Sequence, residues 1–130
     1  MKKLSAILLS VFFSGLLLAQ APVISFDNSS YDFKKIKEQD GLASTVFKFK
    51  NTGDAPLVIN RVQASCGCTT PTWTKEPILP GKTGEVTASY NPENRPGSFI
   101  KTISVFSNAG TAPTLLTIKG EVIPKPAVER

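Results

Sequence analysis

The sequence predicts an all-β protein with about seven strands in an antiparallel immunoglobulin-like β-sandwich. Apolar and polar residues alternate in short segments along most of the chain, which is typical of half-buried strands. No window keeps the three-four spacing of apolar residues that an amphipathic helix requires. Clusters of Gly, Pro and Asn separate the segments at intervals of roughly 8 to 15 residues, as in sandwich domains of about 100 residues.

The first part of the chain predicts an export signal. Two lysines precede an almost unbroken apolar run over residues 4–18, and the small residues Ala19 and Ala21 follow it. The run is shorter than the ~18 to 20 apolar residues of a membrane-spanning helix. We therefore expect a signal peptide over residues 1–19, with cleavage after Ala19 or Ala21, no stable membrane span, and a periplasmic or extracellular location.

The alternating segments place aromatic residues on one face of the predicted strands. Phe47 and Phe49 share a face, with Lys48 and Lys50 on the other, so we expect both phenylalanines in the core. Phe99 is also expected there, although the pattern slips between Phe99 and the next residue, which indicates a bulge or a strand buried on both faces. The segments are residues 23–27, 31–36, 44–51, 57–62, 85–90, 99–107 and 114–122.

One domain accounts for the rest of the chain. The strands extend over residues 22–123, and the sequence shows no internal repeat and no linker to a second domain. Pro124 and Pro126 then remove two backbone donors, so a ladder cannot continue through them. We expect residues 124–130 to form a flexible, proline-rich tail.

Composition disfavours most enzyme classes. The chain has no histidine, so neither a Ser/His/Asp nor a Cys/His nucleophile can form. A zinc site needs about four ligands, whereas the chain offers two thiols with no acidic residue nearby in the sequence before Glu76. The net charge of +5 falls by two when the leader lysines are removed, too little for a nucleic-acid surface. We expect no enzymatic activity, no cofactor, no resident metal and no nucleic-acid partner.

The only two cysteines lie in the segment Cys66-Gly67-Cys68, for which three interpretations remain open. The thiols can form a disulfide, but Cβ atoms two residues apart on a regular strand lie ~6.5 to 7 Å apart against the ~3.8 Å preferred, so this requires a turn at Gly67. They can instead chelate a soft ion such as Cu(I), or pack as buried or intermolecular thiols. Export into an oxidising compartment favours the disulfide, which we predict to be a weak staple.

A series of short motifs runs through residues 49–109. Its elements are Phe49, Asn51 and Gly53; Pro56, Leu57 and Ile59; Ser65 to Thr69, Pro71 and Trp73; Ile78, Pro80 and Gly81; and Gly97, Phe99, Lys101, Ile103, Val105, Ser107 and Asn108. In these elements the chain resembles a bacterial family of exported domains of unknown function. The family is similar to Hydin-type (ASH) and major-sperm-protein-like domains, so the resemblance implies an immunoglobulin-like sandwich. It implies no activity, and the better-known relatives are mostly interaction modules.

These observations lead to one functional hypothesis and one alternative. The hypothesis is a protein-binding or envelope-assembly module that engages an unidentified envelope protein through a sheet edge or a turn-rich end. The alternative is a small thiol-redox or Cu(I)-binding protein that uses Cys66 and Cys68. Around those cysteines we predict a motif turn containing Gly67, Thr69, Pro71 and Trp73, with Trp73 covering one end of the sandwich beside it.

Overall fold

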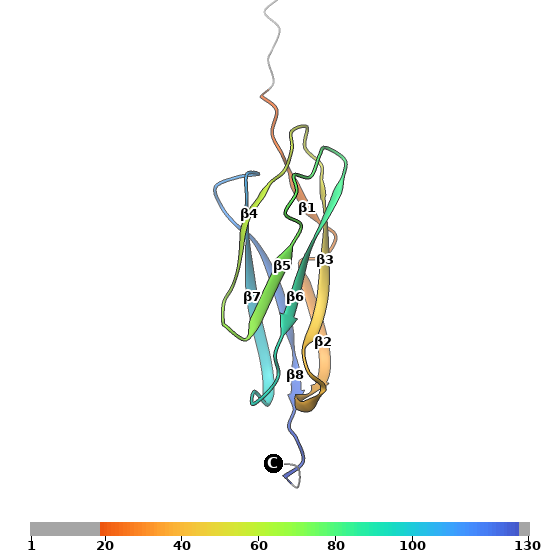
Figure 1. The fold of residues 1–130 in the computed structure, drawn as a ribbon, viewed down its shortest axis with the longest axis vertical. Coiled ribbons are helices and arrows are strands. Elements are labelled where there is room, and N and C mark those ends of the chain that lie inside the picture. Colours follow the sequence, from red (N-terminus) through yellow and green to blue (C-terminus); the bar gives the residue numbers. More distant parts are fainter. Residues whose placement is uncertain (1–18, 128–130) are drawn as a thin grey trace, which may run out of the picture.

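In the computed structural model, which describes residues 19–127, two four-stranded sheets pack face to face (Figure 1). The sheets have the strand orders β1-β3-β6-β5 and β2-β8-β7-β4. The strands are β1 (Ile24–Phe26), β2 (Ser30–Lys37), β3 (Ala43–Asn51), β4 (Ile59–Ala64), β5 (Thr69–Trp73), β6 (Thr83–Tyr90), β7 (Gly97–Ser107) and β8 (Thr114–Ile123). Among the described residues, one helical element is present, the 3-10 turn Glu38–Asp40.

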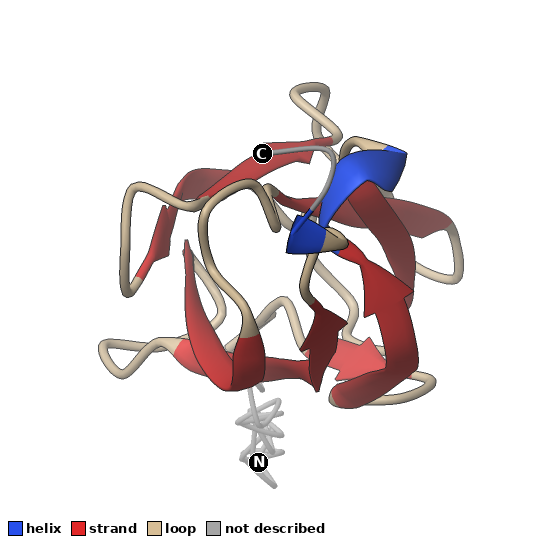
Figure 2. Ribbon diagram, turned by 90° about the horizontal axis from the view of Figure 1, so that it is seen from below, coloured by secondary structure: helices blue, strands red, loops and turns tan. Residues whose placement is uncertain are grey.

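The all-β sandwich is confirmed, and the strand count differs by one. The predicted segments correspond to every strand except β5, so the structure has eight strands. The predicted antiparallel pairing also has one exception, because β2 runs parallel to β8. From β1 the chain crosses to the other sheet without reversing direction, and β2 then pairs with β8 (Figure 1). The end-on view shows the strands of the two sheets surrounding the interior (Figure 2).

The core lies between the two sheets. Phe47, Phe49 and Phe99 are all buried, as predicted, and the ring of Phe99 stacks on Tyr90 with centroids 3.9 Å apart. The predicted irregularity at Phe99 is wrong: β7 and β8 stay in register from Gly97 to Val105, and Ile100 is 70% exposed. Strand alternation therefore holds through this segment, with an apolar residue on the solvent face.

The bulge lies instead in β2. Its register against β8 shifts between Asp32 and Lys35, and Lys34 adopts a positive φ of 61°. The Lys34 backbone N–H donates to the Asp32 carboxylate at 2.8 Å. This hydrogen bond, assisted by the Lys34 charge, lowers the pKa of Asp32 below its usual value, although desolvation opposes the shift.

The structure describes only part of the two predicted chain ends. The predicted signal peptide falls on residues 1–19, of which 1–18 lie outside the described residues. At the start of the predicted tail, the Lys125 N–H donates to Glu38 Oε2 at 2.9 Å. Glu38 is only 2% exposed and also accepts from the Asn94 N–H at 3.1 Å. The first residues of the tail are therefore tied to the body of the sandwich.

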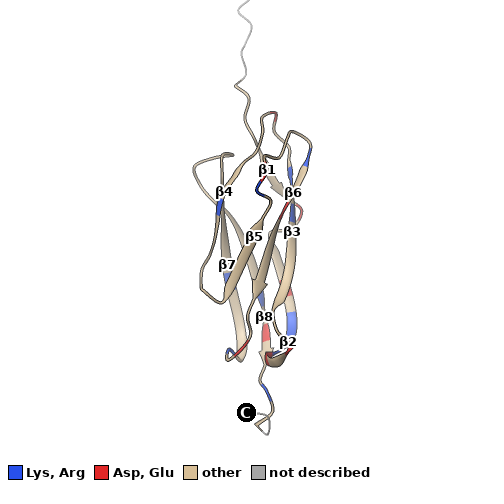
Figure 3. Ribbon diagram, in the orientation of Figure 1, with Lys and Arg blue, Asp and Glu red and all other residues tan. Residues whose placement is uncertain are grey.

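Charged residues are distributed over strands and loops of both sheets (Figure 3). In the stretch from residue 19 to residue 127, no helix has the length and apolar character needed to cross a membrane.

Candidate functional site

Two regions of the sandwich are candidate sites, one for its pair of cysteines and the other for an edge strand with unpaired backbone groups. The first is the connection from β4 to β5, which contains Cys66, Gly67 and Cys68. The sulfur atoms of the two cysteines are joined, with their Cα atoms 5.3 Å apart, and Gly67 and Cys68 form a turn. The two cysteines therefore lie at disulfide distance across a turn, as the predicted pairing requires.

Hydrogen bonds that do not involve the sulfur atoms hold this turn on both sides. On the β4 side, the Ser65 N–H donates to the Thr102 carbonyl at 2.8 Å, and the Thr102 N–H donates to the Ser65 hydroxyl at 3.1 Å. On the β5 side, the Asn91 N–H donates to the Cys68 carbonyl at 2.8 Å. The turn is thus anchored to β7 and to the start of the β6–β7 connection.

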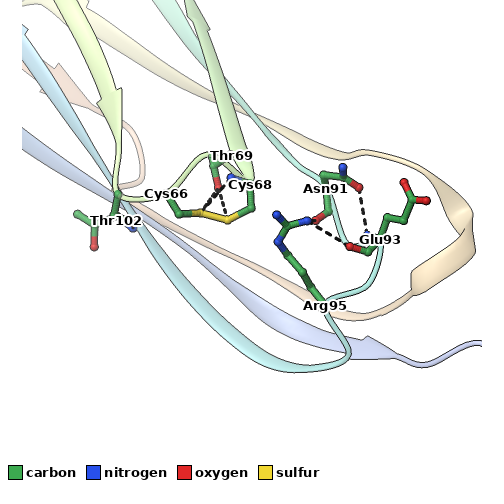
Figure 4. Close-up of a disulfide and its surroundings, with 8 residues drawn as sticks. Cys66, Cys68, Thr69, Asn91, Glu93, Arg95 and Thr102 are labelled. Carbon is green, nitrogen blue, oxygen red and sulfur yellow. Dashed lines mark hydrogen bonds between the residues drawn. A yellow bond between two sulfur atoms is a disulfide. The ribbon is translucent and has the colours of Figure 1, made fainter.

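The two sulfur atoms have different surroundings (Figure 4). Cys68 is 6% exposed and belongs to the core, whereas Cys66 is half-buried at its margin. The Cys68 N–H donates to Cys66 Sγ at 3.3 Å, and the Thr69 hydroxyl lies 3.9 Å from each sulfur. Arg95 reaches back toward the same region, where its Nη1 donates to the Asn91 carbonyl at 3.4 Å.

Two of the other predicted motif residues do not form part of the turn. Thr69 closes it, because its N–H donates to the Cys66 carbonyl at 3.4 Å, whereas Pro71 and Trp73 lie farther along β5. The prediction that Trp73 lies beside the cysteines is wrong, because it stands at the opposite end of β5, roughly 13 Å from Thr69 at ~3.3 Å per residue. There it is half-buried against the core, and Lys75 Nζ lies 3.1 Å from the centroid of its ring.

The second region is the edge of β3. β1 pairs only with Phe49, Lys50 and Asn51, so the earlier part of β3 has a strand partner on the β6 side alone. The Lys48 carbonyl accepts the Asp27 N–H at 3.0 Å and therefore points away from β6. Because backbone groups alternate along an antiparallel strand, those of Val46 and Ser44 point the same way, and no described strand pairs with them there.

A cleft of about 450 Å³ lies along this edge, between β3 and the start of β2. Phe47 forms its buried floor, while Tyr31 and Val46 are 45% and 47% exposed. The charged residues at the cleft are Asp27, Asp32 and Lys48. The signal for this region in the sequence is Val46, an apolar residue on a strand face that otherwise carries Ser44, Lys48 and Lys50, and it was missed.

The opposite edge of the same sheet is closed to strand pairing by a proline. The Thr74 N–H donates to the Glu85 carbonyl on β6, so Thr72 also faces β6 and Pro71 faces outward. Proline has no N–H, so the middle of the β5 edge lacks a donor. Prolines on edge strands are a common protection against unwanted pairing. The edge of β3 has no such protection between Ser44 and Lys48.

The described residues also bear on the metal interpretation of the cysteines. From residue 19 to residue 127, no three or more His, Cys, Asp or Glu side chains group together in a way that could hold a metal ion. Because the two sulfurs are bonded to each other, Cu(I) binding requires their prior reduction.

Several solved structures share this fold at low sequence identity. A protein of unknown function from Porphyromonas gingivalis W83 is 21% identical with a TM-score of 0.69, over 85% of this chain and 51% of that chain. A Bacteroides ovatus GH5 xyloglucanase is 10% identical with a TM-score of 0.51, over 81% of this chain and 20% of that one. The Vibrio cholerae VesB protease is 11% identical with a TM-score of 0.58, over 76% and 31%. At these identities the likeness concerns the fold alone.

The present chain spans about half the length of the Porphyromonas protein and smaller parts of the two enzymes. No curated protein matches the chain. One family does match, over residues 24–122, which include all but the outermost residues of the sandwich, and it is described as a protein of unknown function. The chain therefore belongs to the DUF1573 family.

Proposed function

We propose that this protein is an exported, non-enzymatic binding module that accepts an extended segment of an envelope protein at the open edge of β3. The observation that carries this proposal is the outward-facing backbone groups of Ser44 and Val46, which follow the Lys48 carbonyl already paired with the Asp27 N–H. Such groups hydrogen-bond an added strand, as in other modules that bind by β-strand addition. The export signal predicted from residues 1–19 supports an envelope location.

The cleft indicates the chemistry of the partner segment. Exposed Tyr31 and Val46 offer apolar contact on the two sides of the edge, and Phe47 closes the floor between them. Because side chains alternate along a strand, an extended segment with an apolar residue at every second position fits this surface. Asp32 and Lys48 present charges of both signs, which favours a segment with mixed polar residues at the remaining positions.

Site-specific photocrosslinking tests the location of the binding surface. Val46, Thr87 and Thr72 form one row across the sheet, with Val46 at the β3 edge and Thr72 at the β5 edge. A photoreactive residue at Val46 is expected to capture a discrete envelope protein in intact cells, and the same residue at Thr72 is the matched control. Equal capture at both edges, or capture at Thr72 alone, contradicts the proposal.

A proline substitution then tests the role of the backbone. Val46→Pro removes an outward N–H and leaves the β6 ladder intact, in the way that Pro71 does at the other edge. We expect this variant to melt cooperatively and to lose binding of a synthetic peptide that covers the crosslinked segment. Val46→Thr, which retains the N–H, should keep most of the binding. If the proline variant and the wild type bind the peptide with equal affinity, backbone pairing at Val46 does not contribute to binding.

A further inference from the structure

We infer that the Cys66–Cys68 disulfide is a reversible redox site at which the thiolate of a dithiol partner attacks Cys66. This inference goes beyond the proposed binding role, which needs no chemistry at the sulfur atoms. The two sites lie at opposite edges of one sheet, since β3 and β5 flank β6. Failure of one proposal therefore leaves the other open to its own test.

The local fold keeps the two cysteines adjacent in either redox state. The disulfide closes its ring through Gly67 alone, so it removes little chain entropy and contributes little to holding the fold together. The turn is held instead by the hydrogen bonds of Ser65 with Thr102 and of Cys68 with Asn91. Opening the S–S bond leaves those hydrogen bonds in place, so the reduced thiols stay positioned to close again.

The surroundings of the two sulfurs determine which one is attacked. Thiol exchange requires access to one sulfur and departure of the other as a thiolate. Cys66 is half-buried and Cys68 is 6% exposed, so an incoming thiolate reaches Cys66 first. Polar donors then favour thiolate over thiol at both positions: the Cys68 N–H toward Cys66 Sγ and the Thr69 hydroxyl near both sulfurs.

Arg95 places a positive charge on the connection that borders the disulfide (Figure 4). Its guanidinium donates to the carbonyls of Asn91 and Glu93 at 3.4 and 3.2 Å, and the Asn91 N–H in turn binds the Cys68 carbonyl. These hydrogen bonds fix the connection whose Asn91 N–H binds the Cys68 carbonyl, so we assign to Arg95 a positioning role in the exchange.

The exchange balances as two successive substitutions at sulfur. The partner thiolate forms a bond to Cys66 Sγ, the bond between Cys66 and Cys68 breaks, and the Cys68 thiolate takes a proton from water. The second thiolate of the partner attacks the partner's own sulfur in this mixed disulfide and releases the Cys66 thiolate, which is also protonated. The partner dithiol is oxidised to a disulfide by two electrons, and Cys66 and Cys68 are reduced to thiols.

The wild-type mature protein with reduced glutathione as the probe gives the most direct test. Brief exposure followed by acid quenching traps the mixed disulfide, and fragmentation mass spectrometry identifies the cysteine that carries glutathione. We expect at least about tenfold more adduct on Cys66 than on Cys68. We also expect the reduction rate to be independent of low denaturant concentrations, because the folded protein reacts. Equal labelling, or reduction that occurs only through unfolding, overturns the inference.

Single-cysteine and charge variants provide an independent measurement. Cys68→Ser should form a mixed disulfide with oxidised glutathione about tenfold faster than Cys66→Ser, once melting curves show both variants to be folded. Arg95→Gln should slow the Cys68→Ser reaction severalfold. Lys82→Gln is the matched control, since Lys82 precedes β6 and Arg95 lies beyond its other end. Equal rates for the two single-cysteine variants, or equal slowing by both charge changes, contradict the assignment.

Discussion

The side chain of Asn51 donates a hydrogen bond to the backbone carbonyl of Ile78 at 2.9 Å, and Asn51 is fully buried. The same amide nitrogen donates to the Ala55 carbonyl at 2.8 Å, while its oxygen accepts from the N–H groups of Gly53 and Val23. One asparagine thus joins the end of β3, the following turn and the residue before β1. These hydrogen bonds explain why an asparagine occupies the third position of the motif Phe-x-Asn-x-Gly.

Replacement of this asparagine should therefore be costly. Asn51→Ala removes the side-chain partner of the half-buried Ala55 carbonyl and Gly53 N–H, and one of the two partners of the Ile78 carbonyl, which also accepts from the Leu57 N–H. We expect the free energy of unfolding to fall by about 1 to 3 kcal/mol, since a buried group that loses its partner costs about that much. Asn60→Ala, at an exposed position of β4, is the control and should change little. Chemical denaturation of both variants measures the difference.

Phe49 and Gly84 are paired directly across β3 and β6. A Cβ atom added to Gly84 would lie 2.5 Å from the end of the Phe49 ring. Gly84→Ala should therefore destabilise the fold by about 1 to 3 kcal/mol through overpacking. The double variant Gly84→Ala/Phe49→Leu should recover part of this loss, and additive effects in a double-mutant cycle would show that the two positions do not interact.

Truncation of the same ring tests the core directly. Phe49 is 1% exposed, and its ring lies 5.2 Å from that of Phe26, centroid to centroid. We expect Phe49→Ala to cost about 3 to 5 kcal/mol, which is a large share of the stability of a small domain. An unchanged melting temperature would place Phe49 outside the core and shift the register of β3 by one residue.

Tyr90 should make the protein less stable at high pH. Burial raises the pKa of Tyr90 above its usual value near 10, although the charge of Arg95 partly opposes the shift. Near pH 10 the phenol of the unfolded chain loses its proton before that of the folded chain. The contribution of Tyr90 to the free energy of unfolding is therefore fully present below pH 10 and is lost as the pH rises toward the folded-state pKa. Tyr90→Phe should flatten this decline in urea denaturation between pH 9 and pH 11. Identical slopes for both proteins would contradict it.

Reduction of the disulfide should leave the fold nearly as stable as before. The ring closed by Cys66 and Cys68 contains only Gly67 between them, so its loop-closure contribution is about 1 kcal/mol or less. Melting curves with and without reductant measure the change, and alkylation of the unfolded protein counts the thiols. Two alkylated cysteines before reduction would exclude the disulfide. A large fall in melting temperature would show that it is a strong staple.

Alternation along the chain was sufficient to predict the sandwich and its phenylalanine core, because a half-buried strand imposes a period of two on the sequence. It could not reveal β5, because Pro71 reads as a turn residue, and only the position of Pro71 on an outer edge makes it compatible with a strand. The parallel pairing of β2 with β8 depends on a crossing between sheets that leaves no local pattern.

The candidate sites were predictable to different degrees. Cys66 and Cys68 could be paired from composition and compartment, since the chain has no third cysteine. Trp73 was misplaced because its distance from the cysteines depends on the missed strand β5. The open edge of β3 arises because β1 ends at Phe26, and strand length and pairing partners are properties of the assembled sheet rather than of any local segment.

Amide hydrogen exchange on β3 measures strand addition at single backbone groups. The N–H of Val46 points to the open edge, whereas that of Phe47 points to β6 and is already paired. When a peptide covering the crosslinked partner segment is added, strand addition should slow exchange of the Val46 amide by at least about tenfold. Exchange of the Phe47 amide should not change. Binding that leaves the Val46 amide exchanging at its original rate, or that protects another edge instead, would contradict strand addition at β3.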